Sequence, residues 1–178
     1  ASPCSEDRPL RRRGAPPAAR EEAAKLSNPR TVAVVTGQQA GLFGGPLFTV
    51  LKALTAIKLA EQVEREHGVP AVAIFWIDAE DHDWDEVRSV TVFDDVLATQ
   101  SVALPARSDT DPAPVATVCL DRSVASVLDE LERVLPATEF RERLVADLRS
   151  SYAPGVGMAE AFGRWIEHIL GQRGLIVF

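Results

Sequence analysis

The sequence predicts an α/β protein whose mostly parallel sheet is flanked by helices, and two strand-like segments joined by a helix carry this prediction. Residues 31–36 and 71–77 are continuous apolar runs, which is typical of parallel strands buried on both faces. Residues 47–66 have helical spacing and are long enough to form the crossover that a parallel pair requires. The apolar residues expected to turn this helix toward the sheet are Leu47, Val50, Leu51, Leu54 and Ile57.

The remaining elements place residues 31–178 in a single, partial core domain. Short strands are expected at 88–93, 100–104, 116–120 and 175–178, and helices at 124–134, 138–150 and 158–171. Residues 1–30 are rich in Pro, Arg and Ala and are expected to form a poorly ordered basic segment, within which residues 20–26 are a candidate for a short helix that ends before Asn28-Pro29. We expect the domain to be truncated, because the sequence starts without Met and stops on an apolar run.

Composition narrows the class of protein. The formal net charge is −7 over 178 residues, which argues against a nucleic-acid partner. No run of about 18 apolar residues is present, so no membrane-spanning helix is expected. Two cysteines are too few for a disulfide framework and favour a reducing, cytoplasmic setting.

A glycine-rich loop at 37–46 follows the first strand. Its glycines stand at positions 37, 41, 44 and 45, a spacing that matches neither the dinucleotide-binding fingerprint nor the P-loop. Two interpretations remain open. The loop is either a cradle whose backbone N–H groups approach an anion at the start of the helix, or a tight turn.

An acidic loop at 78–86 follows the second strand and holds six carboxylates in nine residues, with His82 among them. Because ligands of open parallel sheets bind outside the carboxyl ends of the strands, we expect both loops to line one crevice. His82 fits a general acid or base, and Asp81-His82-Asp83 fits a metal site. The carboxylates also fit a substrate ammonium group, and the alternative to all three is a solvated acidic turn.

Three sequence blocks resemble the bacillithiol biosynthesis cysteine-adding enzymes, the BshC family. The most specific is TGQQAGLFGGPLFT at 36–49. The second is FWI at 75–77 followed by EDHDWDEV at 80–87, and the weakest is AFGRW at 161–165 with GQRGLIV at 171–177. The resemblance covers residues 31–178 and leaves 1–30 unexplained.

This resemblance implies a Rossmann-like core, a helical connecting region and a C-terminal coiled coil that makes the full-length protein a homodimer. The implied reaction joins the carboxyl of L-cysteine to the amino group of glucosaminyl-malate, forming the amide bond of bacillithiol. ATP is the expected activator and no metal is expected. The fragment alone is expected to be inactive.

Carried over by position, the family motifs assign roles to eleven residues. The expected catalytic residues are Asp81, His82 and Asp83. The expected substrate- or nucleotide-binding residues are Gln38, Gln39, Gly41, Gly44, Gly45, Thr49, Lys52 and Glu80. The chain departs from the family pattern at Phe48 and Leu51, where aromatic residues (mainly Tyr) are expected, and at Asp78, where a small residue is expected. A metal-dependent hydrolase and a non-catalytic nucleotide-binding module remain as alternatives.

Overall fold

The computed structural model describes residues 14–107 and 114–178, which fall into two compact units. The first unit combines the described N-terminal residues up to 38 with 47–78 and 166–178. The second combines 39–46 with 79–165. The prediction of a single, partial core domain at 31–178 stays a prediction. No helix in the described part of the chain has the length and apolar character needed to cross a membrane.

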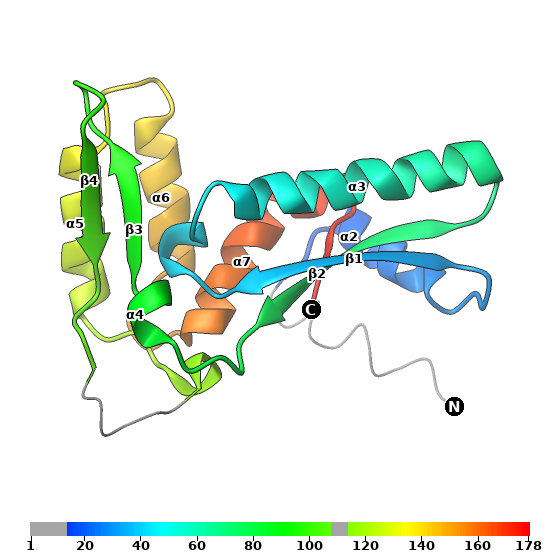
Figure 1. Ribbon diagram of the computed structural model, residues 1–178, viewed down its shortest axis with the longest axis horizontal. Coiled ribbons are helices and arrows are strands. Elements are labelled where there is room, and N and C mark those ends of the chain that lie inside the picture. The colour runs from blue at the N-terminus through cyan, green and yellow to red at the C-terminus, as the bar shows by residue number, and fades with distance from the viewer. Residues whose placement is uncertain (1–13, 108–113) are drawn as a thin grey trace. The chain divides into compact units, whose positions relative to one another are not determined.

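The first unit is built on a three-stranded, mostly parallel sheet with β2 in the middle (Figure 1). Its strands, in spatial order, are β1 (Val32–Gln39), β2 (Ala71–Asp78) and β5 (Ile176–Val177). β2 and β5 run parallel, with Ile74 opposite Ile176. Helix α3 (Phe48–His67) connects β1 to β2. The predicted α/β class, with a parallel sheet and flanking helices, is confirmed.

The two predicted strands differ in burial. β2 is mostly buried, as expected for a central strand, and Phe75 at its middle is fully enclosed. β1 is an edge strand with exposed side chains, including Val35, which is 60% exposed. The prediction that both strands are buried on both faces is therefore wrong for β1, because continuous apolar character does not distinguish an edge position from a central one.

Helix α3 packs on β2 through small side chains rather than through its leucines. The buried face consists of Thr49, Ala53, Ala56, Ile57 and Ala60. Leu47 is 75% exposed and Leu51 is 54% exposed, so the predicted sheet-facing stripe is wrong at these two positions, while Val50 and Leu54 are half-buried and Ile57 is buried. Alanines allow the helix backbone to approach the sheet closely, and this stripe has the same helical spacing as the leucine stripe.

Helix α2 (Pro17–Lys25) covers the sheet within the segment that was predicted to be poorly ordered. Its side of the sheet is closed by a small apolar cluster of Ala15, Ala19, Ala23, Val72 and Ile176. Lys25 Nζ also lies 2.9 Å from Glu64 Oε1 of α3. The prediction of poor order is therefore corrected for residues 14–30, because alanines at positions 19 and 23 give α2 a buried face. Residues 1–13 lie outside the described residues.

The second unit pairs a hairpin with helices (Figure 1). β3 (Ser89–Phe93) and β4 (Thr99–Ala103) are antiparallel, and α5 (Ser123–Val134) contacts both β4 and α6 (Arg141–Ser151). The short helices are η1 (Leu42–Gly44), α4 (Trp84–Val87) and η2 (Val115–Thr117). Helix α7 (Met158–Leu170) begins in this unit and ends in the first, before η3 (Gly171–Arg173). The strand predicted at 116–120 is wrong, because η2 and a single bridge between Cys119 and Gly157 take its place.

A pair of substitutions on α3 tests which face the helix buries. Ala53→Leu inserts a large side chain where Ala53 has no exposed surface, and overpacking should lower the free energy of unfolding by about 1–3 kcal/mol. Leu51→Ala, on the exposed side, should change it by no more than about 0.5 kcal/mol. Urea unfolding of both variants measures the difference. The opposite ranking would show that the leucine stripe faces the sheet.

Candidate functional site

The side chain of Gln39, the last residue of β1, joins the glycine-rich loop to the acidic loop. Its amide Nε2 donates to Asp81 Oδ2 at 2.5 Å and to Glu86 Oε2 at 3.1 Å. All three residues belong to the second unit. The structure thus brings one predicted substrate-binding residue and one predicted catalytic residue into direct contact, although 42 positions separate them in the sequence.

The hydrogen bond from Gln39 sets the charge state of Asp81. It is the main cause that holds the pKa of the Asp81 carboxyl below its usual range. The backbone N–H of Asp83, which donates to Asp81 Oδ1 at 3.1 Å, lowers that pKa further. Asp81 is therefore ionised at neutral pH, a state that suits the binding of a substrate ammonium group and not the donation of a proton.

Other carboxylates of the acidic loop are also held by internal donors. Asp83 caps helix α4 by accepting from the backbone N–H of Glu86 at 3.1 Å. Asp85 accepts from Arg88 Nε at 2.6 Å. These donors offset part of the mutual repulsion of the loop. The predicted catalytic role of Asp83 stays a prediction, and the structure assigns its carboxylate to the helix cap.

Glu80 and His82 present their side chains to solvent. Both are exposed, and the backbone carbonyl of His82 accepts from the N–H of Trp84 at 2.9 Å, which closes the turn into α4. An exposed imidazole beside the ionised Asp81 is open to a ligand. Across 14–107 and 114–178, no three His, Cys, Asp or Glu side chains are grouped so as to hold a metal ion.

The glycine-rich loop uses its backbone N–H groups internally. The Gly44 N–H donates to Tyr152 Oη at 3.0 Å, and Tyr152 Oη donates to the Gly41 carbonyl at 2.9 Å. The N–H groups of Gly41 and Gly45 donate to the carbonyls of Gln39 and Leu42, both at 2.9 Å. Of the two open interpretations, this geometry favours the tight turn. The three amides do not fit the phosphates of a nucleotide.

Position 44 requires a glycine for two reasons, its backbone conformation and the lack of space for a Cβ. Its φ is +96°, and a Cβ there would lie 2.2 Å from the ring of Trp165. The preceding Phe43 also has a positive φ of 51°, which is uncommon for a bulky residue. Its ring meets that of Tyr152 edge-on, with centroids 5.2 Å apart. The loop is therefore shaped by aromatic residues from α7 and from the end of α6.

Tyr152 is the site-shaping residue that the motifs do not reveal. It is the chain's single tyrosine and follows α6, 111 positions after Gly41. Nothing in the spacing of the sequence connects the two positions. The feature of the sequence that could have pointed to Tyr152 is its residue type, because a buried tyrosine hydroxyl usually has a hydrogen-bond partner.

Three further predicted binding residues lie in the first unit. Lys52 Nζ donates to Gln38 Oε1 at 3.0 Å and lies 5.1 Å from the centre of the Phe48 ring. Thr49 is completely buried, and its hydroxyl has no hydrogen-bond partner among the described residues, so a contact with a ligand from solvent is not available to it. The crevice predicted to unite these residues with the acidic loop stays a prediction, since each unit is described by itself.

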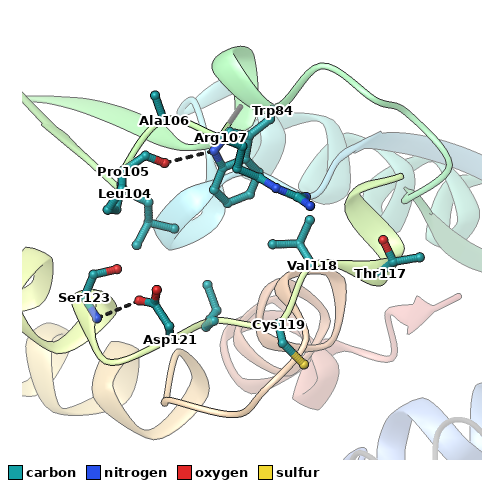
Figure 2. Close-up of a pocket in the computed structure, with 11 residues that line it drawn as sticks. Trp84, Leu104, Pro105, Ala106, Arg107, Thr117, Val118, Cys119, Asp121 and Ser123 are labelled. Carbon is teal, nitrogen blue, oxygen red and sulfur yellow. Dashed lines mark hydrogen bonds between the residues drawn. The ribbon is translucent and has the colours of Figure 1, made fainter. Parts of the chain in front are cut away.

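The second unit also has an open pocket of about 260 Å³, and none of the predicted site residues lines it (Figure 2). Trp84, from the acidic motif, forms one wall and donates its indole N–H to the Pro105 carbonyl at 3.0 Å. Asp121, which also lines the pocket, accepts from the Ser123 N–H at 2.8 Å. The indole of Trp84 is thus held in place at the wall of the pocket by its hydrogen bond to Pro105.

Comparison with known proteins identifies the family of this chain. The family described as "Bacillithiol biosynthesis BshC, N-terminal Rossmann-like domain" matches residues 9–178. The chain belongs to this BshC family. The match begins at residue 9, so the resemblance extends into the segment 1–30 that it was expected to leave unexplained.

Curated relatives carry the name "Putative cysteine ligase BshC". The relative from Symbiobacterium thermophilum is 38% identical over 174 residues, covering 92% of this chain and 31% of the relative. The relative from Chlorobaculum tepidum is 41% identical over 157 residues, covering 88% and 28%. The relative from Geobacillus kaustophilus is 36% identical over 156 residues, covering 86% and 28%. The chain thus spans about three tenths of the length of these relatives.

Replacing Gln39 with Met tests the control of the Asp81 carboxyl. Without the amide donor, the pKa of Asp81 should rise toward its usual value, which a 13C NMR titration of aspartate-labelled protein measures. Because the folded-state pKa is the lower one, the stabilisation from this bond should be present above about pH 4 and disappear as the pH falls through the folded-state pKa.

Gln38→Met is the matched control. Gln38 and Lys52 both belong to the first unit, and the Gln38 side chain accepts from Lys52 rather than contacting Asp81. It should leave the pKa of Asp81 unchanged. An equal shift in both variants would show that the effect comes from a general disturbance of the strand end and not from the amide of Gln39.

Proposed function

We propose that the full-length protein is an amide-forming cysteine ligase that joins the carboxyl of L-cysteine to the amino group of glucosaminyl-malate, giving bacillithiol. This chain supplies its N-terminal Rossmann-like domain. Family membership and the names of the relatives support the proposal. The structural observation that carries it is the contact of Gln39 with Asp81 and Glu86, because it joins the two motifs that identify the family.

The proposed reaction requires a base and two kinds of charge recognition. When the amine attacks the activated carboxyl, the C–N bond forms, the activating group leaves the acyl carbon and the nitrogen loses a proton, which the exposed imidazole of His82 is suited to accept. The ionised carboxylate of Asp81 and the exposed Glu80 suit a substrate ammonium group. Lys52, with Gln38, suits a substrate carboxylate.

Activation, assembly and location belong to the same proposal and come from the family resemblance. ATP is the activator that the resemblance implies. The amides of Gly41, Gly44 and Gly45 donate to internal acceptors, so they are not the groups that would hold its phosphates. A homodimer formed by a C-terminal coiled coil, working in the cytoplasm, completes the proposal.

Conversion of glucosaminyl-malate by the full-length protein tests this function. With L-cysteine and ATP supplied, bacillithiol formation should be detectable by mass spectrometry. His82→Ala should lower kcat by about 100- to 10,000-fold, the usual contribution of a general base. His67→Ala is the matched control, because His67 is an exposed residue in the last turn of α3, and it should leave kcat unchanged.

Two results would contradict the proposal. No conversion by wild-type protein would reject the ligase function. Conversion that is unaffected in His82→Ala would retain the ligase but remove His82 as its base, and it would favour a binding role for the acidic loop.

A further inference from the structure

The hydroxyl of Tyr152 makes two hydrogen bonds that close the glycine-rich loop. It accepts from the Gly44 N–H and donates to the Gly41 carbonyl, at 3.0 and 2.9 Å. A phenol has one proton to donate and lone pairs to accept, so both bonds form at once. Tyr152 is only 1% exposed, and water therefore does not compete for either bond.

The hydrogen bond that the Tyr152 hydroxyl donates to the Gly41 carbonyl does not depend on pH over the physiological range. Burial raises the pKa of the Tyr152 hydroxyl well above its ordinary value. The hydroxyl thus remains protonated over the physiological range and continues to donate to Gly41. The two bonds and the edge-on ring contact also hold Phe43 in its left-handed conformation, which is uncommon for a bulky residue.

The loop held by Tyr152 is directly connected to the Gln39 side chain. The Gly41 N–H donates to the Gln39 carbonyl at 2.9 Å, so the residue clamped by Tyr152 also fixes the backbone of Gln39. The Gln39 amide in turn donates to Asp81 and Glu86. A continuous series of bonds therefore runs from a tyrosine after α6 to a carboxylate of the acidic loop.

We propose that Tyr152 is a positioning residue for the substrate site, acting through Gly41 on Gln39 and through Gln39 on Asp81. It sets the orientation of the amide that keeps the two carboxylates together and does not itself contact the substrate. The assignment to a substrate site rests on the proposed function. The structural role of Tyr152, in which its hydroxyl orders residues 39–45, does not depend on the proposed function.

Tyr152→Phe is the discriminating variant, because it removes the hydroxyl and keeps the ring against Phe43. Hydrogen exchange of the full-length protein, read by mass spectrometry, should show about tenfold or faster exchange in a peptide covering 37–48. A peptide from α5 should exchange at the wild-type rate. Leu128→Val, a core change in α5, is the control and should leave the peptide 37–48 unaffected.

Kinetics separates positioning from a general loss of stability. In the ligase assay, Tyr152→Phe should raise the KM of glucosaminyl-malate about tenfold with little change in kcat. If Tyr152 acts through Gln39, the double variant Tyr152→Phe with Gln39→Ala should be no worse than Gln39→Ala alone. Leu128→Val should alter neither constant.

The proposal is overturned if faster exchange in Tyr152→Phe is spread equally over the loop and α5, or if the loop keeps its wild-type rate. Fully additive effects of Tyr152→Phe and Gln39→Ala on KM would also overturn it. If the wild-type protein has no ligase activity, the proposed function fails. In that case the exchange experiment by itself upholds or overturns the positioning role.

Discussion

The amide of Gln39 is the interaction on which the arrangement of the acidic loop depends. Asp81 and Glu86 repel each other, and a side-chain amide has two N–H protons that satisfy one oxygen of each. The same contact lowers the pKa of Asp81 and keeps it charged. A residue at the end of one strand thereby sets the chemistry of a loop that follows another strand. This is the usual place for a ligand site in an open parallel sheet.

The glycine-rich loop supports this contact through its shape and not through free amides. The N–H groups of Gly41, Gly44 and Gly45 donate within the loop or to Tyr152, and Gly44 lies close against the Trp165 ring. The glycines are needed for close packing and positive φ, which are reasons for glycine that do not involve a phosphate. A glycine-rich loop at the end of a strand is therefore not, by itself, an indication of nucleotide binding.

Local pattern predicted β2 and α3 of the first unit well, because a long helical segment between two apolar runs leaves few alternatives. β2 and α3 lie within about two residues of their predicted bounds, and Gln39 and Asp81 stood in the two motifs that carried the resemblance. The errors concern tertiary context. Which stripe of α3 is buried depends on how closely it approaches β2, and the packing of α2 depends on Ile176 at the far end of the chain. Tyr152 was missed because its partners are distant in sequence.

The measurement that tests the central claim most directly is calorimetric titration of glucosaminyl-malate into the full-length protein carrying Gln39→Ala, Asp81→Asn or both. If the contact between the two motifs forms the substrate site, each single variant should weaken binding at least about tenfold, and the double variant should fall well short of the summed effects. Wild-type affinity in both single variants would contradict the account and place the substrate elsewhere in the protein.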